Sequence, residues 1–332
     1  MTTFPAFVVR KSSTGDVSVQ VEQLSRDDLP AGEVLIEVAY SSLNYKDALA
    51  SRGHPGVVQS FPHVPGIDCA GRVVESSSPD WQPGQEVLVT GYELGASHWG
   101  GYSQFVRVPA EWVVAMPPGL DARGAMIYGT AGFTAAQCVA ALQHHGITPD
   151  RREVLVTGAT GGVGIVALAI LAKLGYRVSA VSGKPEFYDL LRKVGAVETL
   201  SREALADESD RPLLKARWVG AVDTVGGRPL ANIVRSIEHR GCVAACGLVA
   251  GDQVPLTVYP FLLRGVTLAG IDSAKCPRDS RLEMWRRLAG EWRVELPEEL
   301  VTTVDLKGLP ERIEAILAGK VAGRTLVVPR AE

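Results

Sequence analysis

The residues from Gly158 to Gly164 have the types and spacing that bind phosphate groups. They read Gly-Ala-Thr-Gly-Gly-Val-Gly and stand between an apolar strand pattern and an apolar helix pattern, with alanine at the first position of a strict G-x-G-x-x-G. In that setting Gly161 lets the backbone approach a pyrophosphate, and Gly164 lets the helix pack closely on the strand. The amides of Gly162 and Val163 face the phosphate charge. The pattern predicts a dinucleotide site; the alternative is a tight turn with a purely structural role.

The strand after this turn ends in residues that suit a phosphate better than a hydroxyl. An NAD site normally has an acidic residue there, which accepts a hydrogen bond from the ribose 2′-OH. Here the strand ends in Ser182-Gly183-Lys184, and no Asp or Glu appears before Glu186. The third strand ends near Arg202, which could lie beside them. We therefore predict NADPH as the coenzyme; alternatively, Lys184 and Arg202 are ordinary solvated charges.

These residues need a scaffold that brings strand ends together, and the patterning predicts one of class α/β. Up to about residue 122 the chain shows short β-branched runs separated by Gly, Pro, Asp and Ser, typical of a small barrel or sandwich. Strands and helices then alternate, with a helix over 228–241 and a sixth strand over 266–273. This alternation is the pattern of a doubly wound parallel sheet. The tail ends in a strand pattern that could rejoin the first domain.

Residues that bind zinc in dehydrogenases of this architecture are missing. Those enzymes carry a catalytic Cys, a Gly-His-Glu segment and four clustered cysteines, whereas Pro65-Gly-Ile-Asp-Cys69 stands where Gly-His-Glu would fall. Cys242 and Cys246 are close but have no third ligand nearby, so we interpret them as structural core cysteines. The six histidines show no i, i+4 spacing. We predict no metal site and no zinc.

Composition excludes several other classes of function. The net charge of −3 over 332 residues provides no concentrated basic surface, so we expect no nucleic-acid partner. The N-terminus lacks the pattern of a secretory signal, and the longest apolar stretch is too short to span a bilayer. Five irregularly spaced cysteines favour reduced thiols. We predict a cytoplasmic protein with a small-molecule substrate and no membrane partner.

Eight short stretches of the sequence together indicate a particular protein family. They are residues 42–49 (SLNYKDAL), 65–68 (PGID), 98–101 (HWGG), 129–135 (GTAGFTA), 157–164 (TGATGGVG), 221–226 (AVDTVG), 241–248 (GCVAACGL) and 323–326 (GRTL). With them the chain resembles the quinone oxidoreductase branch of the medium-chain dehydrogenase/reductase superfamily, and most closely its acryloyl-CoA reductase (NADPH) subgroup. The resemblance covers nearly the whole chain.

The resemblance implies two domains with an active site in the cleft between them. Residues 1–124 and 302–332 would form a GroES-like β-barrel substrate domain, and 125–301 a Rossmann NADPH-binding domain. The family's coenzyme contacts carry over onto Tyr45, Thr130, Thr160, Gly161, Gly162, Val163, Ser182, Gly183, Lys184, Arg202, Leu248, Ser273 and Arg324. Thr130 would face the nicotinamide.

The resemblance also implies zinc-independent reduction of the 2,3-double bond of a short enoyl thioester, acryloyl-CoA to propanoyl-CoA. Charge develops on the thioester oxygen, so hydrogen-bond donors must stabilise it. We predict Asn44, Tyr45 and Asp47 as catalytic residues: Asn44 as amide donor, Tyr45 as hydroxyl donor or nicotinamide contact, and Asp47 as orienting group. Alternatively, Asn-Tyr-Lys-Asp is a turn and helix cap in which Asp47 binds backbone amides.

Two other functions stay open at this point. An NADPH quinone or enone oxidoreductase of the same fold would show the same coenzyme residues, and a non-catalytic NADPH-binding protein would keep the same glycine turn. The sixth strand would be an exposed, apolar sheet edge in a monomer. We therefore predict a homodimer that pairs through this edge strand of the coenzyme domain.

Overall fold

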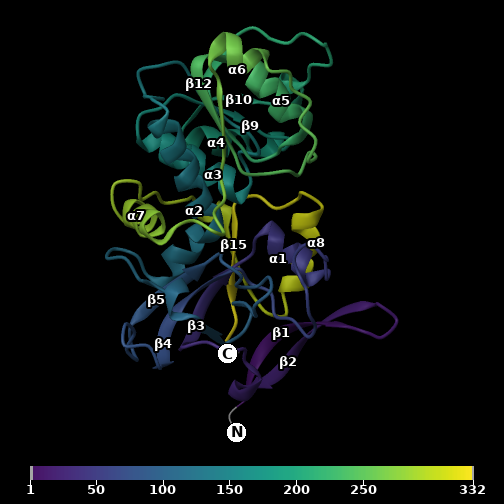
Figure 1. The fold of residues 1–332 in the computed structure, drawn as a ribbon, viewed down its shortest axis with the longest axis vertical. Helices are drawn as coiled ribbons and strands as arrows, with labels where there is room; N and C mark the ends of the chain where they lie inside the picture. The colour runs from purple at the N-terminus through teal and green to yellow at the C-terminus, as the bar shows by residue number, and fades with distance from the viewer. Residues whose placement is uncertain (1–2, 331–332) are drawn as a thin grey trace. The chain divides into compact units, whose positions relative to one another are not determined.

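The computed structural model describes residues 3–330, which fold into two compact units (Figure 1). Within that range, the first unit holds the residues up to Thr130, Ala274–Leu282, and the residues from Glu298 onward. The second unit holds Ala131–Ser273 and Glu283–Pro297. Two helices, α2 (Ala122–His144) and α7 (Arg278–Ala289), contribute residues to both units.

The boundaries of these units differ from the predicted domains at three places. Residues 125–130, 274–282 and 298–301 lie in the first unit, whereas the sequence assigned them to the coenzyme domain. Hydrogen bonds account for two of these differences. The amide of Thr130 donates to Asp68 Oδ2 at 2.9 Å, and the buried Arg281 donates to the carbonyl of Thr90 at 2.6 Å.

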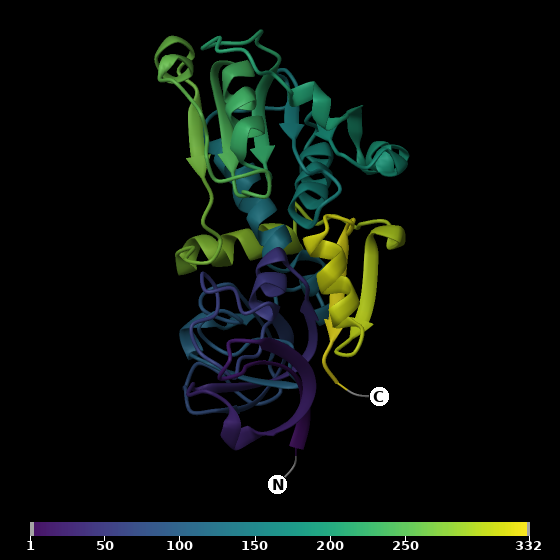
Figure 2. The same cartoon turned by 90° about the vertical axis from the view of Figure 1, so that its right-hand side faces the viewer.

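The first unit is built around β3 (Val34–Ser42), whose pairings are antiparallel, while β14 and β15 pair in parallel. A seven-stranded sheet has the order β14-β15-β3-β4-β5-β7, with β6 also paired to β3, and a separate hairpin joins β1 to β2. The C-terminal strand β15 pairs with the end of β3, so the tail rejoins the first unit, as the sequence predicted. In Figure 2 the tail (yellow) lies beside the N-terminal part of this unit (purple). The other elements are β1 (Thr3–Lys11), β2 (Val17–Ser25), α1 (Tyr45–Ser51), β4 (Asp68–Ser76), β5 (Glu86–Thr90), β6 (Phe105–Val108), β7 (Val114–Ala115), β14 (Val301–Asp305), α8 (Leu309–Leu317) and β15 (Arg324–Val328).

Strand β3 buries both of its faces, which explains its apolar sequence. Leu35 packs in one core cluster with Phe4, Phe7 and Tyr102. Ile36 points the other way, into a second cluster with Val87. Successive side chains of a strand alternate between faces, so one strand serves two cores. This doubly buried strand ends at Ser42, immediately before the predicted catalytic residues.

The second unit is a doubly wound parallel sheet, as predicted. Its six strands have the order β10-β9-β8-β11-β12-β13, and every pairing is parallel. The chain starts at the centre with β8, winds outward to β10, then crosses to β11 and winds to β13, which is the Rossmann order. The strands are β8 (Val154–Val156), β9 (Val178–Val181), β10 (Ala196–Leu200), β11 (Trp218–Asp223), β12 (Ile237–Ala245) and β13 (Thr267–Gly270); the helices are α3 (Gly162–Lys173), α4 (Tyr188–Val194), α5 (Gly227–Ser236) and α6 (Tyr259–Arg264).

One predicted element of the second unit ends earlier than expected. The helix predicted over 228–241 stops at Ser236, and Ile237 already opens β12. Ile237 is fully buried and pairs with Trp218 of β11, so its burial in the sheet outweighs the helical pattern that precedes it.

Among residues 3–330, only α2 has the length and composition of a membrane-spanning helix. Most of it is buried inside the protein, and its helical geometry breaks at Gly129, where φ is +50°.

Candidate functional site

The glycine turn has the geometry that its sequence predicts. It begins after β8 with Gly158 at φ +55°, and Gly161 is the N-cap residue of α3. A Cβ added to Gly164 would collide with the carbonyl of Gly158, so only glycine allows this contact between helix and strand. The first-turn amides of α3, including those of Gly162 and Val163, have no carbonyl one turn earlier in the helix and therefore suit an anion.

The predicted coenzyme residues of the second unit all lie at one edge of its sheet. Because the six strands are parallel, their carboxyl ends share that edge, which is where ligands of open α/β sheets bind. Ser182 follows β9, Arg202 follows β10, Leu248 follows β12 and Ser273 follows β13. Leu248 is 65 % exposed, so its side chain is accessible to a ligand.

Ser182, Lys184 and Arg202 form what we call the phosphate corner. The Arg202 guanidinium packs on the backbone of Gly183, since a Cβ added there would collide with it. The Ser182 hydroxyl lies 3.1 Å from that of Thr160 and accepts the Lys184 amide at 3.2 Å. Burial lowers the pKa of Lys184, the neighbouring Arg202 lowers it further, and Glu186 opposes them. Two cations and a hydroxyl therefore lie close together after the ends of β9 and β10.

A set of buried bonds behind the turn was not predicted. Asp223, at the end of β11, accepts the Thr157 hydroxyl at 2.8 Å and the Gly226 amide at 2.8 Å. Thr224 donates two hydrogen bonds to Thr157. Its backbone amide donates to the Thr157 hydroxyl, and its own hydroxyl donates to the Thr157 carbonyl. These bonds join the ends of β8 and β11, the central strands beside the turn.

A second group of polar residues, which we call the carboxylate cluster, lies inside the first unit around Asp68. Asp68 Oδ2 accepts the Ser42 hydroxyl at 2.5 Å and the Asn44 amide group at 2.8 Å. Asp68 Oδ1 accepts the Thr130 hydroxyl at 2.6 Å, and Oδ2 also accepts the Thr130 backbone amide. Asp68 is fully buried at the start of β4. It thus connects the end of β3 with the part of α2 directly after its break at Gly129.

Asp47 is the second carboxylate of the cluster and is also fully buried. Its Oδ1 accepts the amides of Gly66 and Ile67, and its Oδ2 accepts the backbone amide and the side-chain amide of Asn44. Burial and the nearby Asp68 raise the pKa of Asp47 to about 7, against the effect of these donors. Because Asp47 is the third residue of α1 and binds the N-cap amide of Asn44, the helix cap considered as an alternative is present.

Arg324, at the start of β15, is the cation of the cluster. It is 3 % exposed and donates to the Ser42 hydroxyl at 2.9 Å, to Asn44 Oδ1 at 3.3 Å and to the carbonyl of Ile127 at 2.8 Å. Burial lowers the pKa of Arg324, whereas Asp68 and Asp47 raise it. The cluster therefore places one buried guanidinium among two buried carboxylates, with hydroxyl and amide groups between them.

The structure brings together most residues predicted for catalysis but divides them by exposure. Asn44 directs its amide hydrogens at Asp68 and Asp47, so in this conformation they are engaged within the protein. Tyr45 is 41 % exposed and is the accessible member of the predicted three. Thr130 and Arg324, predicted as coenzyme contacts, both bind cluster residues.

Sequence reasoning did not assign Asp68 or Ser42 to the site. Asp68 lay within a stretch that carried the resemblance, and the available signal was an acid directly before the small, apolar residues Cys69, Ala70 and Gly71.

No group of three or more His, Cys, Asp or Glu side chains within residues 3–330 is arranged to hold a metal ion. Cys242 is buried in β12, and burial raises the pKa of its thiol to about 11. Cys246 donates to the carbonyl of Asp223 at 3.4 Å.

Two family models match the chain, one for each part of this architecture. Residues 30–118 match the alcohol dehydrogenase GroES-like domain, and residues 162–290 match the zinc-binding dehydrogenase model. Together with the parallel sheet and the glycine turn, they define a two-domain dehydrogenase with a GroES-like domain and a Rossmann-type domain.

Relatives that match the chain over nearly its full length indicate which group within this class of dehydrogenases it resembles. The acrylyl-CoA reductase AcuI of Ruegeria pomeroyi is 48 % identical over 98 % of both chains. The probable acrylyl-CoA reductase AcuI of Escherichia coli is 47 % identical over 94 % of this chain and 96 % of its own. The chain belongs to the medium-chain dehydrogenase/reductase superfamily, as its sequence motifs predicted, and is similar to the acrylyl-CoA reductases within it.

Solved structures agree with this assignment. The yhdH oxidoreductase of Salmonella enterica in complex with NADP has a TM-score of 0.93 and 46 % identity, covering 99 % of this chain and 100 % of its own. The Bacillus subtilis protein yhfP with NAD bound has a TM-score of 0.94 and 45 % identity, with 99 % and 100 % covered. These two structures hold different coenzymes, NADP in the first and NAD in the second.

Proposed function

We propose that the protein is an NADPH-dependent, zinc-independent reductase of the 2,3-double bond of a short enoyl thioester, converting acryloyl-CoA to propanoyl-CoA. The observation that carries this proposal is the similarity, at 47 and 48 % identity and over nearly full length, to two acrylyl-CoA reductases. The phosphate corner supports the coenzyme and the exposed Tyr45 supports the chemistry.

The residues of the second unit fit NADPH. The first turn of α3, with Thr160 beside it, suits the pyrophosphate. Lys184 and Arg202 suit a 2′-phosphate, and no acidic side chain stands at the end of β9 to bind a free 2′-OH. Leu248 and Ser273 line the same edge of the sheet. Bound NADPH supplies the hydride for C3 of the enoyl group.

The residues around Asp68 do not fit zinc. Catalytic zinc sites hold three protein ligands drawn from His, Cys, Asp and Glu. Asp68 instead accepts bonds from two hydroxyl groups and two amides, and the Arg324 guanidinium lies 2.9 Å from one of those hydroxyls. A buried guanidinium at that position repels a divalent cation. The proposed reduction therefore uses no metal ion.

Reduction at C3 leaves negative charge on the thioester oxygen, and donors of this chain must stabilise it. Tyr45 is our candidate, because its side chain is exposed while that of Asn44 is bound to carboxylates. We assign Asn44 and Asp47 to positioning: Asp47 holds the N-cap residue of α1, and Tyr45 is the first residue of that helix. C2 then takes a proton from Tyr45 or from water.

Steady-state assays with NADPH and a substrate panel test the function. We expect turnover with acryloyl-CoA to exceed turnover with small quinones and enones, and to survive chelation of divalent metals. A preference for quinones would favour the alternative suggested by a 46 % identical relative that is named as a quinone oxidoreductase, YhfP of Bacillus subtilis. Tight NADPH binding without oxidation across the whole panel would contradict an enzymatic role.

We also propose a cytoplasmic homodimer that pairs through β13. This strand ends the six-stranded sheet, so one of its edges has no partner strand among the described residues. Leu268 of β13 is 37 % exposed, and α6, which precedes β13 in the chain, exposes Leu262 at 75 % and its N-cap residue Val258 at 63 %. Exposed apolar edges are usually covered. Sedimentation equilibrium at micromolar concentration tests it, and a monomer mass would contradict it.

All five cysteines are free thiols, which supports a reducing compartment. With a net charge of −3, we propose no nucleic-acid partner, and we propose none in a membrane.

A further inference from the structure

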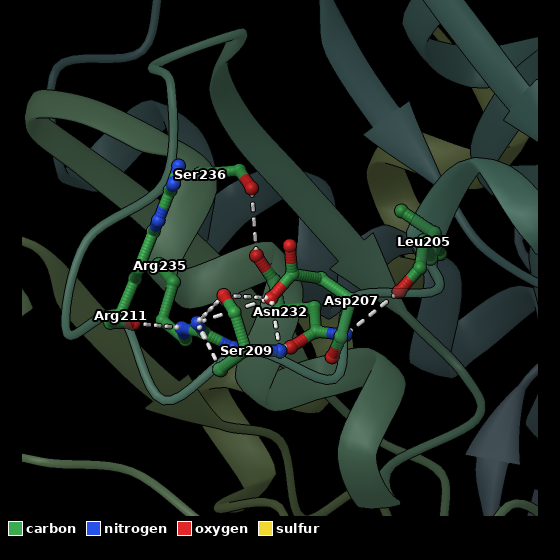
Figure 3. A network of polar contacts seen from close by, with 7 residues as sticks. All are labelled: Leu205, Asp207, Ser209, Arg211, Asn232, Arg235 and Ser236. Atoms are coloured by element: carbon green, nitrogen blue, oxygen red, sulfur yellow. Dashed lines mark hydrogen bonds and ion pairs between the residues drawn. The ribbon is translucent and has the colours of Figure 1, made fainter.

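The short turn that carries Arg202 is held in place by a helix to which the proposed mechanism gives no role. This turn is the 3₁₀ helix η4 (Arg202–Leu205), directly after β10. Asn232, in the middle of α5, donates its side-chain amide to the carbonyl of Leu205 at 2.8 Å and to that of Asp207 at 3.0 Å. Asn232 is 3 % exposed, and Figure 3 shows it between the two carbonyls.

Arg235, one turn later on α5, fixes the orientation of that amide. Its guanidinium donates to Asn232 Oδ1 at 2.8 Å, which leaves the NH₂ group of Asn232 facing the carbonyls. It also donates to the carbonyls of Ser209 and Arg211 and to Asp207 Oδ1 (Figure 3). Apart from the bond between Arg235 and Asn232, which lies within α5, each of these bonds has its donor on α5 and its acceptor on the loop. The Asn232 amide cannot flip without placing its NH₂ group against the Arg235 guanidinium.

The turn is also anchored at its other end. The amide of Ser182 donates to the carbonyl of Leu200 at 3.0 Å, which joins the start of the turn to the phosphate corner. At the end of the turn the Leu205 side chain is buried in the core cluster with Trp218 and Ile233. Arg202 thus lies between two fixed points, although it is itself exposed.

We infer that Asn232 and Arg235 are positioning residues for coenzyme selection, acting through the Leu205 carbonyl to hold Arg202 over Gly183. This inference rests on the proposed use of NADPH. A long, exposed arginine loses rotamer freedom when it binds a phosphate, and a fixed backbone limits that loss to the side chain. Without Asn232 two carbonyls lose their donor, the turn shifts, and the coenzyme must order it again.

The test compares KM for NADPH and for NADH in the full-length enzyme with acryloyl-CoA. Arg202→Ala establishes the direct effect: we expect KM for NADPH to rise about tenfold or more, as for a lost bond to a charged group, with KM for NADH unchanged. Asn232→Leu keeps similar volume but removes the donor; we expect KM for NADPH to rise about three- to tenfold and kcat to stay within about twofold. In the double variant Asn232→Leu should add nothing to Arg202→Ala, because its effect passes through Arg202.

Arg264→Gln is the matched control. Arg264 donates to the carbonyl of Leu214 at 2.6 Å, at the far end of the same loop, and to the main-chain carbonyls of Arg235 and Ile237. This variant therefore loosens the loop away from Arg202 without removing any bond made by the side chains of Asn232 and Arg235. We expect lower stability with the NADPH-to-NADH ratio unchanged. If Asn232→Leu does not fold, Asn232→Gln, which displaces the same amide by one methylene, replaces it.

The outcomes separate the inference from the proposed function. If Arg202→Ala leaves the discrimination between coenzymes unchanged, the proposed NADPH corner is wrong and the inference falls with it. If Arg202→Ala abolishes the discrimination but Asn232→Leu raises both KM values equally, or adds fully to Arg202→Ala, Asn232 has only a structural role and the inference alone is overturned.

Discussion

The carboxylate cluster of the first unit and the phosphate corner of the second are both polar groups at strand ends, but their surroundings are opposite. In the cluster, Asp47, Asp68 and Arg324 are buried and bind other protein groups. In the corner, Arg202 is exposed and packs on bare backbone at Gly183. A buried charge that loses its partner remains desolvated, whereas an exposed cation remains hydrated. Substitutions in the carboxylate cluster should therefore lower the free energy of unfolding, and substitutions in the phosphate corner should lower the affinity for NADPH.

The sharpest test of this comparison is Arg324→Met. It leaves Asp47 and Asp68 without their buried cation, and we expect a loss of about 3–5 kcal/mol in the free energy of unfolding, measured by urea titration. The control is Arg10→Met, which breaks the largely exposed pair with Glu22 and should cost about 1 kcal/mol or less. Equal losses in the two variants would contradict the distinction between buried and exposed charge.

The pH dependence of stability should also come from the cluster. The pKa of Asp47 is about 7 in the folded protein, above its ordinary value, so its stabilising effect is complete at low pH and is lost as pH rises through 7. Relative to Asp47→Asn, the free energy of unfolding should fall by about 2–3 kcal/mol between pH 5 and pH 8. Urea titrations of the wild type and of Asp47→Asn at both pH values measure this change. An equal change in the free energy of unfolding of the two proteins would argue against a raised pKa of Asp47.

Lys184→Ala tests the half-buried cation of the phosphate corner. Removal of one of two cations should raise KM for NADPH by about tenfold, with KM for NADH and the urea midpoint nearly unchanged. The direction also follows from the low pKa of Lys184, because a bound 2′-phosphate would stabilise its charged form. A drop in stability without a change in coenzyme discrimination would place Lys184 with the structural charges.

The smallest expected effect belongs to Gly183→Ala. Its backbone does not require glycine, but the added methyl group occupies the space of the Arg202 guanidinium. A long side chain can move aside, so we expect KM for NADPH to rise only about threefold and stability to stay constant. Combined with Arg202→Ala, the methyl group should have no further effect; additive changes would show that Gly183 acts independently of Arg202.

The sequence predicted the phosphate corner better than the carboxylate cluster, for a physical reason. Ser182 and Arg202 each follow a strand of a parallel sheet, and that topology places all strand ends along one edge. The recurring alternation of strand and helix was visible in the pattern, so the sheet and its edge could be predicted together. The end of the helix at Ser236 could not, because it depends on the pairing of Ile237 with Trp218.

The cluster depends on contacts that no local pattern encodes. Ser42 and Arg324 are bonded although 282 positions separate them, and Asp68 joins Thr130 across 62 positions. Asn44 and Asp47 were predicted from their motif, as catalytic residues or as a helix cap; the cap is present, and their catalytic role remains a prediction. Only the antiparallel pairing of β15 with β3 brings the guanidinium to the carboxylates.

That pairing has a consequence for the order in which the chain is made. The ribosome releases β3 and both carboxylates early, but β15 and Arg324 emerge only after the entire sheet of the second unit. Domains fold largely as units as they emerge during synthesis. The second unit can therefore close on the ribosome while the first, begun earlier, still awaits its cation and its last strand. In this protein the unit that is started first is completed last.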